Sequence, residues 1–225
     1  MKEFQNTDAQ KILNETLPLL LEAGNILRSV DHVGEGIAEK SGDSNFVTKY
    51  DVAVQKLLLD ALGGAFPDAC FFAEEKKNNT LTDALTFIID PIDGTMNFVR
   101  GLRHSCISVG VCAGKTPLCG MIYNPYSDLL YFAVRGEGAY RADAPSVSGF
   151  DHTRRLFIPD CPLSETLAVF GSDPYHKSHT ADITLRGARI LLEHSLDIRR
   201  SGSAALDLAY VASGCYGIYF ENCVS

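Results

Sequence analysis

The feature that most constrains this chain is a short apolar run that leads directly into two closely spaced acids. Residues 86–89, Thr-Phe-Ile-Ile, are typical of a strand buried on both faces of a sheet. The run continues into Asp90, and Pro91 predicts a turn there because proline forbids helix continuation. Since α/β folds usually place functional groups at the carboxyl ends of buried strands, we expect a site at this point.

Two carboxylates, three residues apart, crowd one small volume at this strand end. Asp90 and Asp93 would repel each other if nothing compensated their charges, and one would tend to be protonated. A divalent hard cation such as Mg²⁺ removes that conflict because it takes oxygen ligands, to which the Ile92 carbonyl could add. Gly94 leaves room for a close ligand, and a helix beginning at Thr95 would offer free N–H groups to a phosphate.

The alternative interpretation of these residues is a surface turn, since Asp, Pro and Gly are common turn residues. The buried strand directly upstream favours the functional interpretation. The pair Glu74-Glu75 follows the apolar run 71–73. Alone, such a pair is typical of a solvated surface, and it gains weight only as a third source of carboxylate for the same cluster.

The first part of the chain predicts helices and an antiparallel meander. Residues 7–30 begin with a capping box and carry apolar positions at helical spacing, interrupted by Pro18. Residues 31–45 are typical of a loop or loose hairpin. A second helix is predicted from Thr48 to Gly63-Gly64. Beyond the acidic motif, turn signals separate three further predicted strands, at residues 106–109, 120–123 and 129–132.

The composition changes around residues 142–165, where Pro, Ser, Asp and Gly become frequent, and this change predicts a subdomain boundary. Beyond it the pattern alternates between strands and helices, which indicates an α/β half. The expected elements are strand 167–170, helix 183–193, strand 196–198, helix 204–213 and strand 218–220. We therefore expect an N-terminal α+β subdomain at residues 1–145 and an incomplete C-terminal α/β subdomain at residues 146–225.

Charge and composition limit the classes of partner that the chain is expected to bind. The formal net charge of -8 argues against nucleic acid, and an acidic protein that handles an anionic substrate needs local positive charge, such as a bound metal ion. The seven cysteines include no C-x-x-C pair and the six histidines show no ligand spacing, so buried, reduced thiols are expected. Neither a signal peptide nor a membrane-spanning apolar stretch is visible, which predicts a cytoplasmic protein with no membrane partner.

The chain resembles the inositol monophosphatase family in motifs that cover essentially its whole length. That family carries a Glu-Glu pair, a buried strand and then Asp-Pro-[Ile/Leu]-Asp-Gly-Thr-x-Asn-Phe, and residues 87–98 here read FIIDPIDGTMNF. A second motif is matched by residues 201–214, SGSAALDLAYVASG, and a weaker one by residues 47–51, VTKYD. The resemblance implies a mixed α/β fold, namely a layered αβαβα sandwich of the carbohydrate/inositol phosphatase type.

The resemblance also implies how metal would be held. Glu74, Asp90 and the Ile92 carbonyl would bind a first Mg²⁺, and Asp90 and Asp93 would share a second, with two or three ions per site in the family. The family places a further Asp, preceded by Trp, shortly after the position of Glu221. This chain ends at Ser225 and contains no Trp. We therefore expect a truncated form that binds the second metal less well and is weakly active at best.

The remaining implied roles concern water and substrate. Asp51 and Thr95 would orient and activate the attacking water, although an acid in the first turn of a helix is also favourable to the helix dipole. The phosphate and the alcohol would be held by Asp93, Gly94, Thr95, Gly202, Ser203, Ala204 and Glu221.

The expected reaction is Mg²⁺-dependent hydrolysis of a phosphate monoester by an activated water, with inositol monophosphate as the leading substrate. Alternatives within the family are a fructose-1,6-bisphosphatase or another sugar-phosphate phosphatase. From another class, the chain could be an inactive phosphate- and metal-binding fragment. A two-carboxylate glycosidase is more remote, because it would leave the Gly94-Thr95 phosphate cradle unexplained. The resemblance further implies a homodimer, sensitivity to lithium, and a small phosphorylated polyol or sugar as the partner.

Overall fold

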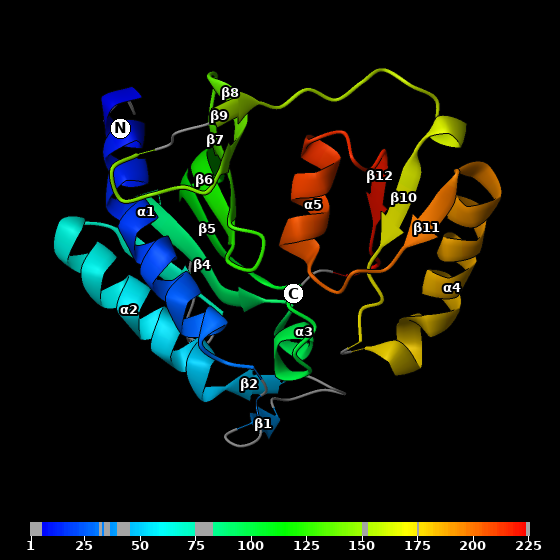
Figure 1. Cartoon of the computed structure of the whole chain (residues 1–225), viewed down its shortest axis with the longest axis horizontal. Coiled ribbons are helices and arrows are strands. Elements are labelled where there is room, and N and C mark those ends of the chain that lie inside the picture. The colour runs from blue at the N-terminus through cyan, green and yellow to red at the C-terminus, as the bar shows by residue number, and fades with distance from the viewer. Residues whose placement is uncertain are drawn as a thin grey trace.

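The computed structural model describes residues 6–31, 33, 37–39, 46–74, 83–149, 153–174 and 176–223. Figure 1 shows these residues as five layers: a pair of helices, a large sheet, a central helix, a small sheet and an outer helix. The predicted αβαβα sandwich is therefore confirmed. Glu75, the side chain of Thr7 and most of the predicted loop at 31–45 lie outside the described part of the chain.

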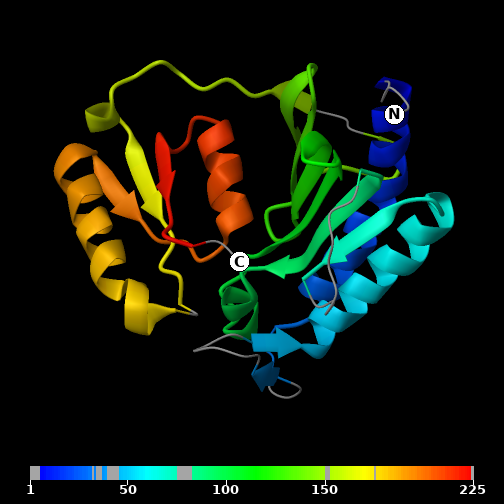
Figure 2. The ribbon, with the colours of Figure 1, turned by 180° about the vertical axis from the view of Figure 1, so that it is seen from behind.

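The first layer is formed by helices α1 (Asn6–Arg28) and α2 (Lys49–Ala65), which cover one face of the large sheet (Figure 2). Helix α1 continues through Pro18 and buries the apolar stripe that the sequence predicts. A small hairpin of β1 (Ile37–Glu39) and β2 (Phe46–Thr48) precedes α2. Helix α2 runs through the glycines at 63 and 64, so its predicted end was wrong. A glycine disfavours a helix by only about 1 kcal/mol, and the buried anchor Leu62 outweighs that.

The large sheet has the strand order β3-β4-β5-β6-β7-β8-β9. Strand β3 runs parallel to β4, and every later pair is antiparallel, which confirms the predicted meander. The strands are β3 (Cys70–Ala73), β4 (Leu85–Asp93), β5 (Cys106–Ala113), β6 (Thr116–Asn124), β7 (Leu129–Val134), β8 (Gly138–Asp143) and β9 (Thr153–Arg155).

Strand β4 differs from the prediction in two respects. Phe87 and Ile89 are 0% and 2% exposed on the face covered by α1 and α2, whereas Ile88, on the opposite face, is 40% exposed. The strand is therefore not fully buried on both faces. Nor does it turn at Pro91: it continues to Asp93, with a shift of register between Asp90 and Asp93. An irregularity of this kind tolerates a proline because the ladder loses one hydrogen bond there anyway.

The second half forms a parallel sheet of β11 (Asp197–Arg199), β10 (Leu167–Phe170) and β12 (Ile218–Phe220), in that order. Helix α4 (Lys177–His194) covers its outer face, and α5 (Ala204–Ala212) lies between the two sheets (Figure 1). A short 3₁₀ helix (Leu163–Glu165) precedes β10. The predicted alternation is confirmed. The division into 1–145 and 146–225 stays a prediction, since strand pairing in the large sheet extends to Arg155.

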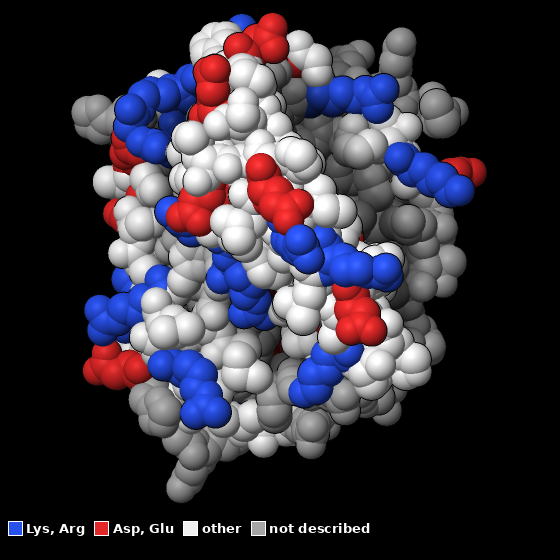
Figure 3. Space-filling model, turned by 90° about the vertical axis from the view of Figure 1, so that its right-hand side faces the viewer, with Lys and Arg blue, Asp and Glu red and all other residues white. Residues whose placement is uncertain are grey.

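The outer face over α4 carries Lys and Arg side chains interspersed with Asp and Glu (Figure 3). Ion pairs on this half include Arg189 with Glu193 at 2.7 Å and Arg199 with Asp197 at 2.5 Å. None of the helices in the described residues has both the length and the apolar character that crossing a bilayer requires.

Candidate active site

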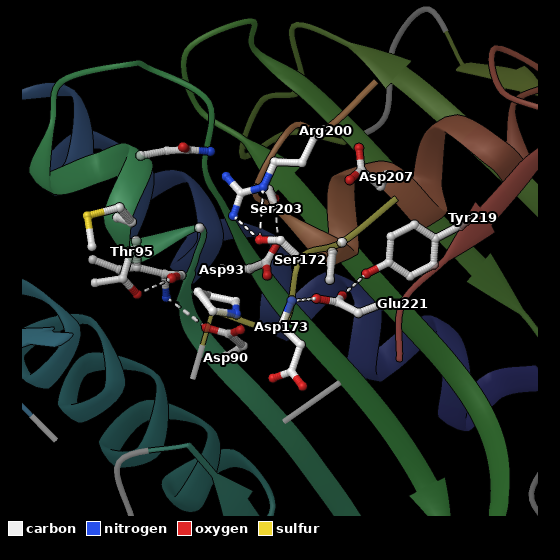
Figure 4. Close-up of a pocket in the computed structure, with 18 of the residues that line it drawn as sticks. Asp90, Asp93, Thr95, Ser172, Asp173, Arg200, Ser203, Asp207, Tyr219 and Glu221 are labelled. Carbon is white, nitrogen blue, oxygen red and sulfur yellow. Dashed lines mark hydrogen bonds between the residues drawn. The ribbon is translucent and has the colours of Figure 1, made fainter. Parts of the chain in front are cut away.

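A pocket opens between the two sheets, where β4, α3 (Thr95–Val99), α5 and the ends of β10 and β12 meet (Figure 4). Its lining includes all the sequence-predicted site residues except Asp51, which lies behind Thr95. The predicted residues that line the pocket are Glu74, Asp90, Ile92, Asp93, Gly94, Thr95, Gly202, Ser203, Ala204 and Glu221.

Parallel pairing of two strands places Glu74 beside Asp90. The register joins Ala73 of β3 to Ile89 of β4, and the Glu74 amide donates to the Ile89 carbonyl at 3.2 Å. The next residue along each strand is therefore an acid at the same end of the sheet. Burial, with the adjacent charges of Asp93 and Glu74, raises the pKa of Asp90 well above its usual range.

Asp93 joins the two halves of the site. Its Oδ2 accepts hydrogen bonds from the Ser203 hydroxyl and, at 3.0 Å, from the Ala205 amide; the Cys106 thiol lies at 3.6 Å. Burial raises the pKa of Asp93, and the Ser203 and Ala205 donors oppose that rise. The carboxylate of Asp93 is consequently turned toward α5, while Asp90 faces Glu74.

Thr95 lies between two acceptors. Its Oγ1 is 2.9 Å from the Ile92 carbonyl oxygen and 3.4 Å from Asp51 Oδ1. Asp51 is 1% exposed, and its Oδ2 accepts from the amide and the hydroxyl of Thr48 at 2.7 and 2.6 Å. The acid is therefore a helix cap and a neighbour of Thr95 at the same time. Burial raises the pKa of Asp51, against the lowering effect of Thr48.

Two glycines allow the halves of the site to approach closely. Gly94 has φ 86°, and a Cβ there would lie 3.1 Å from the Gly202 carbonyl oxygen. Gly202 has φ 87°, and a Cβ there would lie 3.0 Å from an Arg200 nitrogen. Asn97 holds this contact together, since its Nδ2 donates to the carbonyls of His104 at 2.7 Å and Ser201 at 2.9 Å.

Several pocket residues were not anticipated from the sequence. Arg200 donates to the Ser172 hydroxyl at 2.7 Å, and Tyr219 donates to Glu221 (Figure 4). Asp207 is 1% exposed and its Oδ1 has no hydrogen-bond partner among the described residues; burial raises its pKa to about 6. Asp207 follows Ser203 by four residues on a predicted helix, and that spacing is the signal that could have found it.

The oxygen donors at one end of the pocket suit a hard divalent cation. Three carboxylates, from Glu74, Asp90 and Asp93, line this part of the pocket, and the charges of Asp93 and Glu74 raise the pKa of Asp90. Arg200 is the one Lys or Arg among the lining residues that the structure describes, and it donates to the hydroxyl of Ser172. An excess of buried oxygen acceptors fits Mg²⁺, which binds oxygen ligands.

The sequence profile of the inositol monophosphatase family matches residues 8–223. The chain belongs to the inositol monophosphatase family. Inositol monophosphatase 1 of Solanum lycopersicum is 32% identical over 221 residues, which are 96% of this chain and 77% of that protein. Membership confirms the predicted enzyme class, a phosphoric monoester hydrolase.

Solved structures agree with this assignment. The extragenic suppressor protein suhB of Bartonella henselae superposes with a TM-score of 0.80 at 29% identity, covering 95% of this chain and 79% of that one. An IMPase/NADP phosphatase complexed with Mg²⁺ and phosphate gives a TM-score of 0.77 at 25% identity, covering 94% of this chain and 75% of that one. The family fold is thereby confirmed, and the second structure supports a metal cofactor in the family.

Proposed function

We propose that this member of the family hydrolyses the phosphate monoester of a small polyol, with inositol monophosphate as the leading substrate, in a Mg²⁺-dependent reaction. The observation that carries the proposal is the position of Thr95. Its hydroxyl lies between Asp51 and the Ile92 carbonyl, at the rim of a pocket that also holds Glu74 and Asp90. A potential base, Asp51, and oxygen atoms of the kind that bind Mg²⁺ therefore lie around one small volume.

The proposed metal ligands are the oxygens described above. Glu74, Asp90 and the Ile92 carbonyl would hold one ion, and Asp90 and Asp93 would share a second. When bound, Mg²⁺ supplies the positive charge that neutralises the phosphate and acidifies a water molecule. Phosphoryl transfer needs such positioning and charge neutralisation more than covalent help from the protein.

The proton of the attacking water has a path through Thr95. The water donates to Thr95 Oγ1, which passes its own hydrogen to Asp51 Oδ1 across the 3.4 Å contact. The raised pKa of Asp51 makes it a better proton acceptor than an ordinary carboxylate. Asp51 becomes a neutral acid, and the water oxygen that loses the proton attacks phosphorus. The bond between phosphorus and the alcohol oxygen breaks, the leaving alkoxide takes a proton from solvent, and Asp51 returns its proton to solvent.

The substrate would lie across the Gly94–Gly202 contact. The amides of Gly94 and Thr95 would donate to the phosphate oxygens. Asp93, Gly202, Ser203, Ala204 and Glu221 would contact the alcohol. Hydroxyl groups of a polyol suit this wall because carboxylates and carbonyls accept hydrogen bonds from them.

Phosphate release with inositol monophosphate, Mg²⁺ and the purified chain tests the proposal. Asp90→Asn should lower kcat/KM by about 10³-fold or more, since it removes a ligand of both proposed ions. Asp68→Asn, an exposed acid in the turn after α2, is the matched control and should leave activity unchanged. Release that survives EDTA, or equals wild type in Asp90→Asn, contradicts the metal mechanism. No release under any condition favours an inactive binding fragment.

Arg200 favours a second candidate substrate, a bisphosphorylated sugar such as fructose 1,6-bisphosphate. Its guanidinium lines the pocket and could receive a second phosphate, which arginine binds in a bidentate manner. Arg200→Gln should then raise KM for the bisphosphate about tenfold and leave KM for the monophosphate nearly unchanged. Equal effects on both substrates would remove this candidate.

The proposal includes inhibition by lithium and assembly as a homodimer. Family membership supports both. Inhibition that is competitive with Mg²⁺, and a sedimentation mass of twice the 24.5 kDa chain, are the expected results.

A further inference from the structure

A second set of potential metal ligands comes from the end of the small sheet, and two of its three members line the same pocket as Asp90. We propose that Asp173, His176 and Cys223 form a binding site for a zinc-class divalent cation. Ligand atoms of these three side chains all lie within 4.8 Å of one another. Asp173 and Cys223 line the pocket, so the cation would sit at its wall.

The topology of the small sheet brings these residues together. Strands β10 and β12 are parallel neighbours with Phe170 opposite Phe220, and the Gly171 amide donates to the Phe220 carbonyl at 2.8 Å. Asp173 and Cys223 each follow their strand by three residues, so both leave the same edge of the sheet. The connections out of β10 and into β12 use α4 and α5, on opposite faces. This arrangement is the switch point at which open α/β sheets bind ligands.

The buried carboxylate of Asp173 has an oxygen that could bind a cation. It is 2% exposed, and its Oδ2 has no hydrogen-bond partner within the described residues. A buried carboxylate oxygen without a donor is costly unless a cation compensates it. Its amide donates to Glu221 Oε1 at 3.0 Å, which fixes the loop after β10 against the loop after β12.

His176 is already oriented for metal binding. Its Nδ1 lies 2.9 Å from Asp173 Oδ1, and its side chain is 57% exposed. Two ligand atoms at this separation can bind the same cation, so Nδ1 and the Asp173 carboxylate would become ligands of one ion that replaces the contact between them. His176 caps the start of α4, so its backbone is placed by the helix.

The three kinds of ligand atom determine which metal this site would prefer. A carboxylate oxygen, an imidazole nitrogen and a thiolate sulfur favour zinc and its neighbours, whereas Mg²⁺ takes oxygen ligands. The charges of one carboxylate and one thiolate balance a divalent cation. Three protein ligands leave a fourth tetrahedral position for water or a substrate oxygen from the pocket. The two ends of one pocket would therefore bind metals of different hardness.

Cobalt(II) is the probe, because a cobalt–thiolate bond gives a charge-transfer absorption in the near ultraviolet. The 225-residue chain is titrated with Co²⁺ in excess Mg²⁺, which occupies the oxygen-rich end, and one equivalent of Zn²⁺ should displace the signal. Cys223→Ser should abolish the thiolate band. Asp173→Asn and His176→Asn should each weaken binding about tenfold or more. Asparagine also tolerates the φ of 41° at residue 173.

The matched control is Cys215→Ser, which removes an exposed thiol from the same half of the chain and should leave the band intact. As a test on the unmodified protein, Zn²⁺ should protect Cys223 but not Cys215 from alkylation by iodoacetamide, as read by mass spectrometry. A band that survives in Cys223→Ser, or alkylation of Cys223 that ignores Zn²⁺, overturns the site. Neither measurement uses substrate, so the proposed phosphatase reaction can fail without affecting the result.

Discussion

The carboxylate of Asp93 accepts a hydrogen bond from the hydroxyl of Ser203, and this bond joins the large sheet to the helix that leads into the small sheet. The two residues are 110 positions apart. The bond has two physical effects. It opposes the rise in the pKa of Asp93 that burial causes, and it fixes the start of α5 against the end of β4.

Replacing Ser203 tests both effects. Ser203→Ala removes one donor from a buried carboxylate, so the free energy of unfolding should fall by about 1–3 kcal/mol. The pKa of Asp93 should rise further, and a partly protonated Asp93 should bind Mg²⁺ more weakly at low pH. Thermal unfolding and Mg²⁺ titration at two pH values measure these changes. The control Ser148→Ala removes an exposed hydroxyl and should change stability by less than about 0.5 kcal/mol.

The hydroxyl of Thr95 is expected to act in turnover and not in substrate binding. Thr95→Val keeps the size of the side chain and should reduce kcat by about 10²–10⁴-fold, with a much smaller change in KM. Thr95→Ser, which keeps the hydroxyl, should retain most of the activity. Loss of kcat to the same degree in both variants would show that packing at Thr95, and not its hydrogen bond to Asp51, is what matters.

Asp207 should make the metal-free protein less stable as pH rises. Its folded pKa of about 6 exceeds the ordinary value of 3.8, so the unfolded chain loses this proton first. Stability therefore falls between about pH 4 and pH 6 and stays lower above, by about 3 kcal/mol in total. Asp207→Asn should remove that loss. Melting temperatures across this range in EDTA, with Asp68→Asn as the control, should converge at low pH and separate at neutral pH.

Asp90→Asn should distinguish the stability that Mg²⁺ binding adds from the stability of the metal-free protein. Wild type should gain stability with Mg²⁺ because the ion binds the folded state alone. The variant should lose most of that gain. Without metal it should melt a few degrees higher than wild type, since it removes a buried charge beside Asp93 and Glu74. Equal Mg²⁺ stabilisation of both proteins would exclude Asp90 as a ligand.

Local patterns predicted much of the fold and the centre of the site. The helix start at Thr48, the meander and the strand–helix alternation each depend on residues close in sequence, and each is confirmed. The acids at 90 and 93 were found because a strand delivers them together. Where the structure differs from the prediction, a contact between residues far apart in sequence explains the difference. The burial of Leu62 stabilises α2 across its two glycines. Pairing with β5 makes residues 90–93 an irregular strand instead of a turn.

Other parts of the pocket could not be predicted from such patterns. Asp173 and His176 show a spacing that is unremarkable by itself, and Cys223 is almost fifty positions away. They become a set only because β12 pairs with β10 and not with β11, which precedes it in the chain. The donors to Asp93 likewise come from a helix in the other half, so no window of sequence contains both partners.

The alignment of Ala73 with Ile89 has a consequence for how this catalytic centre can vary. Because side chains alternate between the faces of a sheet, a slip of β3 by one position would point Glu74 away from Asp90 and toward the helices. The register is set by the pairing of β3 with β4 and not by the number of residues that join the two strands. The geometry of the acidic cluster therefore depends on the pairing of two short strands.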